Sequence, residues 1–93
     1  MVKMRLRSSA ERDLQRLDRE LRRRLILGCR DVFDDWTIGK RLSSPLQGLR
    51  SHRIGEYRII YRIRASSEID LIALGHRKDI YERMEKRKRS GRA

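Results

Sequence analysis

The stretch from Pro45 to Tyr81 threads arginines and histidines through apolar, strand-like sequence and contains few carboxylates. Such a surface suits a polyanion, and its titratable groups could also cleave one. Cleavage of RNA without a metal needs a group that takes the proton from the ribose 2'-hydroxyl, cations that stabilise charge on the phosphorane, and a group that protonates the departing 5'-oxygen. Arginine suits the second task because its planar fork can hold two phosphate oxygens at once.

Two residues near the end of this stretch, His76 and Tyr81, could carry the proton, and Arg77 lies between them. Histidine titrates near neutral pH, whereas a tyrosine needs surrounding cations to lower its pKa. Each also has a structural interpretation, because a histidine at a strand end is often a surface residue and Tyr81 could anchor a final helix against a sheet. The residues alone leave the proton carrier open. His52 is expected to have a structural role beside Ile59.

The N-terminal part of the chain predicts a strand followed by a helical hairpin. Residues 2–7 alternate apolar and basic side chains, as in a half-buried strand. Ser8 and Glu11 have the spacing of a capping box, and Asp18 has the residue type and position of an N-cap for a second helix. The single cysteine excludes an internal disulfide and is interpreted as a core residue. The second helix is expected to bury Leu25, Cys29, Val32, Phe33 and Trp36.

Three strands are predicted in the second half, over residues 50–54, 57–64 and 68–75, after a connecting loop over 37–49. Gly55-Glu56 fits a two-residue hairpin turn. The predicted fold class is α+β: an antiparallel sheet with an N-terminal helical hairpin, in the order β-α-α-β-β-β, and a short C-terminal helix. At 93 residues the chain is one domain, 1–93, in which residues 86–93 form a basic tail that need not be ordered.

Register decides which side chains share a face of this sheet. The predicted turns place Arg53 directly opposite Arg58, and Arg62 opposite Asp70. Two like charges in direct opposition destabilise a sheet, so an anion would recover that stability. Arg62 has a sufficient structural explanation in its pair with Asp70. The same face is expected to carry His76, while the helices cover the opposite face, formed by Tyr57, Ile59, Tyr61, Ile63, Ile69, Leu71 and Ala73.

The charge of the chain indicates an anionic partner. Lys and Arg number 25 against 13 Asp and Glu, a net charge of +12 that far exceeds what solubility requires. Arg50, Arg62 and Lys78 lie in the same basic stretch and are further candidates for RNA contact. No cluster of Asp, Glu, His or Cys has metal-ligand spacing, and no apolar run approaches the roughly 20 residues that span a membrane. We therefore expect a cytoplasmic protein without a metal or other cofactor.

Two segments, LQGLRSHRIGEYRIIYRI and ALGHRKDIY, carry a resemblance to a known family. A glycine turn followed by YRIIY, then a strand that ends in GHR and a tyrosine four residues beyond that arginine, resembles the RelE/ParE superfamily of toxins, and its RelE-like members in particular. The pattern is formed here by Gly55, residues 57–61, residues 75–77 and Tyr81. The resemblance runs over most of the chain and implies a compact fold similar to small microbial ribonucleases.

The resemblance also implies an activity, because RelE-like toxins enter the ribosomal A site and cleave the mRNA codon there. By position, Arg58 matches the arginine that contacts the scissile phosphate. Arg77 matches an arginine that stabilises charge or protonates the leaving group, and Tyr81 matches a tyrosine that acts as base or stacks on the substrate. Arg53 falls on a basic position of the preceding strand. A second basic position is occupied here by Ser51, so a contact made there by lysine is missing or supplied otherwise.

The implied partners are the ribosome with its mRNA and a RelB-like, acidic antitoxin that wraps the toxin. The chain is expected to be a monomer alone and part of a heteromer with the antitoxin. His76 sits where some members have lysine, which leaves the choice between His76 and Tyr81 open. Two other functions are alternatives: a ParE-like toxin that inhibits DNA gyrase without nuclease activity, and a nucleic-acid-binding domain with no activity. The combination of Arg58, Arg77 and Tyr81 favours the ribonuclease.

Overall fold

The computed structural model describes residues 3–65 and 68–90, the last four of them by their backbone alone. The elements along the chain are β1 (Lys3–Leu6), α1 (Ser8–Gln15), α2 (Arg19–Asp34), a 3₁₀ turn η1 (Trp36–Ile38), β2 (Lys40–Arg41), β3 (Arg50–Ile54), β4 (Tyr57–Arg64), β5 (Glu68–His76) and α3 (Ile80–Ser90). This order confirms the predicted α+β fold. No helix within the described ranges is long and apolar enough to cross a membrane.

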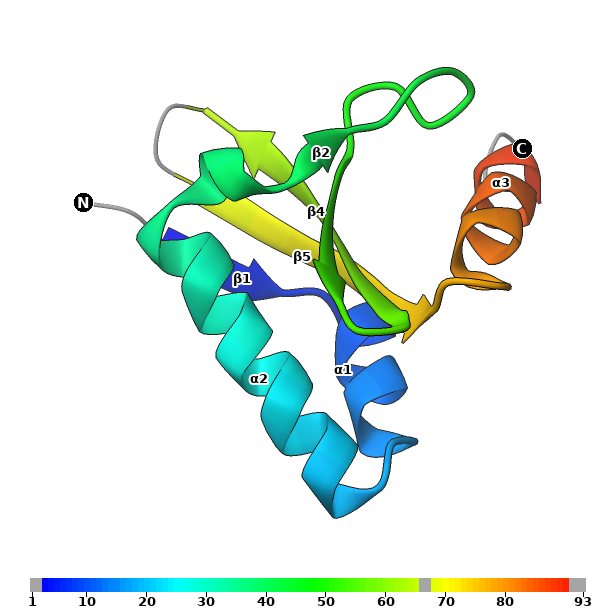
Figure 1. Cartoon of the computed structure of the whole chain (residues 1–93). Helices are drawn as coiled ribbons and strands as arrows, with labels where there is room; N and C mark the ends of the chain where they lie inside the picture. Colours follow the sequence, from blue (N-terminus) through cyan, green and yellow to red (C-terminus); the bar gives the residue numbers. More distant parts are fainter. Residues whose placement is uncertain (1–2, 66–67, 91–93) are drawn as a thin grey trace.

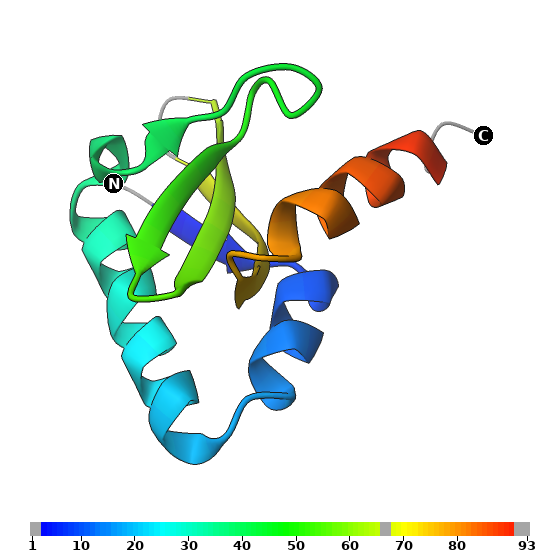
Figure 2. The same ribbon diagram turned by 45° about the vertical axis from the view of Figure 1, so that its right-hand side comes forward.

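The strands form a single sheet in the order β1-β5-β4-β3-β2. Strands β2 to β5 pair antiparallel with their neighbours, whereas β1 pairs with β5 in parallel. Helices α1 and α2 lie together at one side of the sheet, and α3 stands apart from them (Figure 1). Figure 2 shows α3 extending outward from the body of the molecule. Helices α1 and α2 therefore cover one face of the sheet, and α3 packs on the other.

The helical hairpin forms where the sequence predicts it, but one cap differs. Asp18 is the N-cap of α2, and its carboxylate accepts a 2.9 Å hydrogen bond from a backbone amide of the first turn. The predicted capping box at Ser8 is wrong, because α1 begins at Ser8 itself and its N-cap, Arg7, makes no side-chain capping bond. Instead, the Ser9 hydroxyl donates to the Ile72 carbonyl at 2.6 Å. This bond fixes α1 along the edge of β5, beyond the end of β1.

The first core lies between the sheet and the helical hairpin. Its buried residues are Ala10, Leu25, Cys29, Val32, Ile59, Tyr61, Ile69, Leu71 and Leu74. Cys29 is buried as predicted, and burial raises the pKa of its thiol to about 11, so the thiol stays protonated near neutral pH. The prediction that Phe33 lies in this core is wrong, because it sits at the margin of the buried stripe of α2 and is 43% exposed.

A bulge in β5 divides its residues between the two faces. Tyr61 pairs with Leu71 and Ile60 pairs with Ala73, so Ile72 is an extra residue in β5. Ala73 therefore faces away from the helical hairpin, contrary to the prediction, and Leu74 packs in the first core instead. From the bulge onward, the alternation of the strand is shifted by one residue.

A second, smaller core lies on the opposite face, under α3 and the loop before β3. It consists of Leu46, Ile60, Ala73, Ile80 and Met84. Beside it, the Arg83 guanidinium donates to the buried carboxylate of Asp13 at 3.1 Å and to the Leu74 carbonyl at 3.2 Å. Asp13 also accepts a 2.9 Å bond from the Leu74 amide. Packing and this bonded group anchor α3, whose backbone continues into segment 86–93 as far as Ser90; residues 91–93 lie outside the described residues.

The loop predicted over 37–49 contains the short strand β2, which the sequence analysis did not predict. The Tyr61 hydroxyl, at the margin of the first core, donates to the Trp36 carbonyl at 2.6 Å and accepts a bond from the Gly39 amide at 2.9 Å. A Cβ atom at position 39 would collide with this hydroxyl, so the close approach requires glycine. The buried tyrosine thereby fixes the start of β2 beside β3.

Candidate functional site

Strand register places polar and basic side chains on the face of the sheet that α3 covers. Lys40 of β2 pairs with Ser51 of β3, and Ser51 pairs with Ile60 of β4. Directly paired residues have side chains on the same face, so all three share the face of the second core. One row further along the strands, Arg53 pairs with Arg58, as predicted.

Tyr81 reaches this face from α3. The β5 residue opposite Arg58 is Gly75, and the space that a side chain would occupy there is taken by Ile80 and Arg83 of α3. This close approach brings the first turn of α3 over the sheet. The Tyr81 hydroxyl and the Ser51 hydroxyl lie 2.9 Å apart in a hydrogen bond that either can donate. The fold thus brings Tyr81 to the face of Arg58, although all of β5 separates them in sequence.

Arg58, Tyr81 and Lys40 line one cavity of about 420 Å³. The other described residues at its wall are Leu42, Ser43, Ser44, Pro45, Leu46 and Glu85. Glu85 is the acidic residue of this set. With two cations and a phenol hydroxyl at its wall, the cavity can accept an anionic group.

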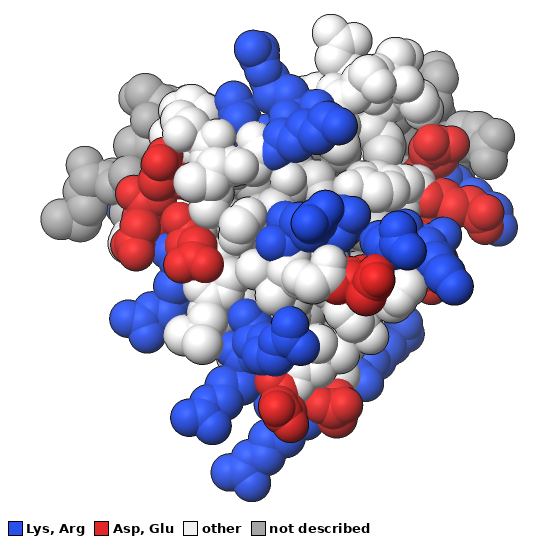
Figure 3. Space-filling model, viewed as in Figure 1, with Lys and Arg blue, Asp and Glu red and all other residues white. Residues whose placement is uncertain are grey.

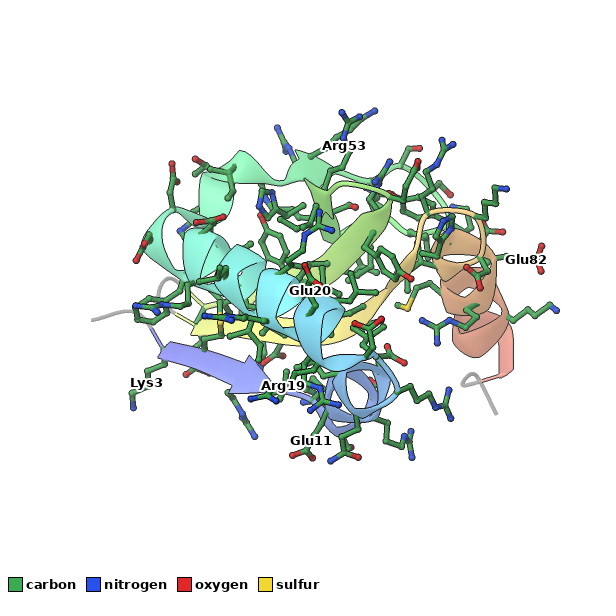
Figure 4. All side chains as sticks on the ribbon, turned by 60° about the horizontal axis from the view of Figure 1, so that its bottom comes forward. Lys3, Glu11, Arg19, Glu20, Arg53 and Glu82 are labelled. Atoms are coloured by element: carbon green, nitrogen blue, oxygen red, sulfur yellow. The ribbon has the colours of Figure 1, made fainter. Side chains whose placement is uncertain are left out.

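Arg58 forms no ion pair with a carboxylate of the described residues. Its guanidinium makes two long hydrogen bonds, of 3.4 Å to the Gly55 carbonyl and 3.3 Å to the Tyr57 carbonyl. Arg53 is exposed and points away from the sheet (Figure 4). The positive charges of Arg53 and Arg58 are therefore not balanced by a carboxylate of the described residues. The prediction that an anion binds here requires such an unbalanced pair.

Arg62 lies on the same face at the other end of β4, and its charge is neutralised. Its Nη2 donates to the fully buried carboxylate of Asp70 at 3.0 Å, and the Nε atom of Arg64 lies 3.8 Å from the same oxygen. The predicted pair of Arg62 with Asp70 is confirmed. Arg62 does not line the cavity of Arg58, so this candidate for RNA contact is separated from the site.

Arg77 is held at the tip of the hairpin between β3 and β4. Its Nε lies 2.7 Å from the Glu56 carboxylate, and its amide donates to the Glu56 carbonyl at 2.8 Å. The Arg77 and Glu56 side chains are 51% and 56% exposed, so their ion pair contributes little to stability. A phosphate could compete for this guanidinium.

His76 lies on the opposite face from Arg58 and Tyr81. It pairs with Tyr57, and the two rings meet edge to face, with centroids 5.4 Å apart and planes at 79°. Its Nδ1 accepts a 3.1 Å bond from the Lys78 amide. The prediction that His76 shares a face with Arg58 is wrong, because the bulge in β5 shifts the alternation before the strand ends.

The remaining candidates for RNA contact lie outside the cavity. Arg50 is on the side of the helical hairpin, where its guanidinium donates to the Gly39 carbonyl at 2.8 Å and lies 5.0 Å from the centroid of the Trp36 ring. With Trp36 and Arg41 it lines a second hollow, of about 660 Å³. Lys78 is exposed in the turn between β5 and α3. His52 pairs with Ile59 on the face of the first core, as predicted.

Lys40 is the cationic lining residue that the sequence analysis did not identify. It lies in a segment predicted as loop, and a strand of two residues is too short to show a periodicity. The basic pair Lys40-Arg41 before the serine- and proline-containing loop was the one available signal. Its place beside Ser51 follows only from strand pairing.

The face of the molecule in Figure 3 and the net charge of +12 both suit a polyanion. Lys and Arg side chains are spread over the face shown in Figure 3, and Asp and Glu form smaller groups among them. Within the described ranges, no group of three or more His, Cys, Asp and Glu side chains could hold a metal ion. Lys40, Arg58 and Tyr81 at the cavity are residue types that can bind an anion and transfer a proton.

Residues 4–81 match the family model described as the ParE toxin of type II toxin-antitoxin system, parDE. Because the match spans most of the chain, the chain belongs to this family, and its fold places it in the RelE/ParE superfamily, as the sequence resemblance predicts. It is the toxin of a type II toxin–antitoxin system. A search of curated proteins found no significant match.

Solved structures share the fold. A chain of the RelBE2 toxin–antitoxin complex from Mycobacterium tuberculosis has a TM-score of 0.73 and 27% identity, over 81% of this chain and 96% of that chain. The isolated RelE toxin of E. coli has a TM-score of 0.68 and 18% identity, over 94% and 98% of the two chains. A chain of the RelB-RelE complex from Methanococcus jannaschii has a TM-score of 0.63 and 20% identity, over 84% and 95%.

Proposed function

We propose that this toxin is a ribosome-dependent endonuclease that cleaves mRNA in the ribosomal A site by metal-independent attack of the ribose 2'-hydroxyl. The observation that carries the proposal is the cavity shared by Arg58 and Tyr81. A cation without a carboxylate partner in the described chain and a phenol held by a hydrogen bond are two kinds of group that phosphodiester cleavage needs. The likeness to a chain of the RelBE2 complex supports the proposal.

Each group has a role in this reaction. Arg58 binds the scissile phosphate and stabilises the charge that develops on it. Tyr81 relays the proton of the 2'-hydroxyl to the departing 5'-oxygen, because Ser51 holds its hydroxyl on the face of Arg58 while His76 lies on the other face. Arg77 binds the substrate once its half-exposed pair with Glu56 opens, and such a pair costs little to open.

The proposed partners are the ribosome with its mRNA and an acidic, RelB-like antitoxin, both met in the cytoplasm. A net charge of +12 favours association with RNA and with an acidic inhibitor alike. The relatives from Mycobacterium tuberculosis and Methanococcus jannaschii are parts of toxin–antitoxin complexes, which supports the antitoxin as a partner. The toxin is a monomer until the antitoxin binds.

The experiment is inducible expression of the toxin with mapping of mRNA 5' ends, for the wild type and for Arg58→Ala and Tyr81→Phe. Arg5→Ala is the matched control, because Arg5 is an exposed arginine on β1, away from the cavity. We expect codon-phased ends for the wild type and the control, and their loss in the other two variants. Growth arrest without phased ends, unaffected by either substitution at the cavity, would contradict the proposal.

A second candidate function is inhibition of DNA gyrase without nuclease activity. The observation that favours it is the family model, which is described as a ParE toxin. Supercoiling of relaxed plasmid by purified gyrase tests this candidate. Inhibition that persists in Arg58→Ala and Tyr81→Phe would support it, and supercoiling at the normal rate in excess toxin would exclude it.

A further inference from the structure

Strand β2 presents one cation to each face of the sheet. Lys40 pairs with Ser51, and Arg41 pairs with Arg50. Successive side chains of a strand point to opposite faces. Lys40 accordingly lines the cavity of Arg58 and Tyr81, whereas Arg41 lines the hollow on the other side.

Lys40 and Arg58 line the cavity from two different strands. The two residues belong to β2 and β4, which flank β3, and neighbouring strands are about 4.8 Å apart. Between them β3 carries Ser51, whose hydroxyl is bonded to that of Tyr81. An anionic group in the cavity would therefore have Lys40 on the side of β2, Arg58 on the side of β4, and Tyr81 at the same wall.

Lys40 makes no ion pair within the described residues, although Glu85 lines the same cavity. The charge of Lys40, like that of Arg58, is therefore not neutralised by an ion pair within the described residues. A lysine on an edge strand also discourages pairing with another chain, but Arg41 on the same strand would serve that purpose equally well. The position of Lys40 at the cavity has no such alternative explanation.

We propose that Lys40 binds the phosphate of the RNA at this site and, with Arg58, stabilises the charge that develops during cleavage. The proposal rests on the ribonuclease function proposed above. The lysine ammonium is a point charge on a flexible stem, so it can follow the phosphate as its geometry changes, while the arginine fork fixes two of its oxygens. Lys40 thereby supplies, from the neighbouring strand, the cation that Ser51 does not provide.

Single-turnover cleavage of the A-site codon on programmed ribosomes tests this role, with Lys40→Ala, Lys40→Arg and Arg41→Ala compared with the wild type. Lys40→Ala and Arg41→Ala remove the same charge from adjacent residues that face opposite sides. We expect Lys40→Ala to lower the rate about 10²-fold, the low end of the effect of one charge-stabilising donor. Lys40→Arg should retain most of the rate, and Arg41→Ala should stay within about twofold of the wild type.

The outcomes separate this proposal from the one on which it rests. If the wild type cleaves and Lys40→Ala cleaves as fast as Arg41→Ala, the role of Lys40 is wrong and the ribonuclease function stands. If the wild type does not cleave, both fail. Equal loss in Lys40→Ala and Lys40→Arg, with a lowered thermal midpoint in both, would mean that Lys40 supports the fold rather than the phosphate.

Discussion

Strand β4 carries three arginines on one face, Arg58, Arg62 and Arg64, and the first two differ in their partners. Arg62 is opposite Asp70, which is fully buried and accepts its hydrogen bond at 3.0 Å. Arg58 is opposite Arg53, and no carboxylate of the described residues pairs with either. The two positions have the same residue type, strand and face, so the difference lies in their partners.

The basic side chains therefore fall into two groups: those paired with a carboxylate of the protein, and those available to bind a ligand. Arg62, Arg83 and Arg77 each have a carboxylate partner. Arg58 and Lys40 line a cavity together with Glu85, and neither forms an ion pair within the described residues. A cluster of uncompensated cations costs stability. A ligand that binds these cations would explain why the fold places them together, and four experiments test the difference between the paired and the unpaired arginine.

The largest effect is expected at the unpaired end of β4. Arg58→Ala should lower single-turnover cleavage roughly 10²- to 10³-fold, about 2.7 to 4 kcal/mol, because it removes the main donor to the phosphate. It should change the free energy of unfolding, measured in urea, only slightly, because within the described residues Arg58 has two long hydrogen bonds and no ion pair to lose. If Arg58→Ala lost stability as well as activity, Arg58 would support the fold as Arg62 does, and the proposed difference between the two arginines would be wrong.

At the other end of β4, removal of Arg62 should lower stability and leave cleavage unchanged. Among the described residues, Arg62→Ala leaves the buried Asp70 carboxylate with Arg64 as its ion-pair partner, so the free energy of unfolding should fall by roughly 1 to 3 kcal/mol. At temperatures where the Arg62→Ala variant is still folded, its rate of cleavage should stay near that of the wild type. A variant that keeps full stability but loses cleavage would place Arg62 in the site.

Inorganic phosphate should stabilise the unpaired end. At ten times its dissociation constant, a ligand specific for the folded state adds about 1.4 kcal/mol to the free energy of unfolding. We expect the thermal midpoint to rise with phosphate more in the wild type than in Arg58→Ala, which reports the general salting-out effect alone. Equal rises in both proteins would show that the cavity does not bind phosphate.

The smallest effect is expected from reversing the second charge of the like pair. Arg53→Glu places a carboxylate opposite Arg58, which should raise the free energy of unfolding by about 0.2 to 1 kcal/mol. The same change should weaken cleavage, because Arg58 then has an internal partner. Arg53→Gln is the control that removes the repulsion without adding a carboxylate; higher activity in Arg53→Glu would contradict the assignment.

The sequence was sufficient wherever local pattern decides structure. The helical hairpin, the three long strands, the pairing of Arg53 with Arg58 and that of Arg62 with Asp70 all follow from periodicity and turn residues. The bulge at Ile72 has no such signal, because the apolar residues around it fit an unbroken strand equally well. That extra residue accounts for the errors at both Ala73 and His76.

The candidate site could be predicted in part for the same reason. Arg58 and Tyr81 were named from motif and register, and the fold brings both to one cavity. Lys40 could not be named, because its strand is defined by tertiary contacts of Trp36 and Gly39 rather than by its own two residues. The pair of Arg77 with Glu56 also depends on how two turns meet.

The contact of Gly39 with the Tyr61 hydroxyl has a genetic consequence. When cells express a toxin without its antitoxin, a substitution that inactivates the toxin lets the cell survive. Sequencing the toxin gene of the survivors then identifies positions on which toxicity depends. Any residue larger than glycine at 39 displaces the hydroxyl that fixes the start of β2, and with it the strand that carries Lys40. Such a selection should therefore recover substitutions at a residue that takes no part in the chemistry.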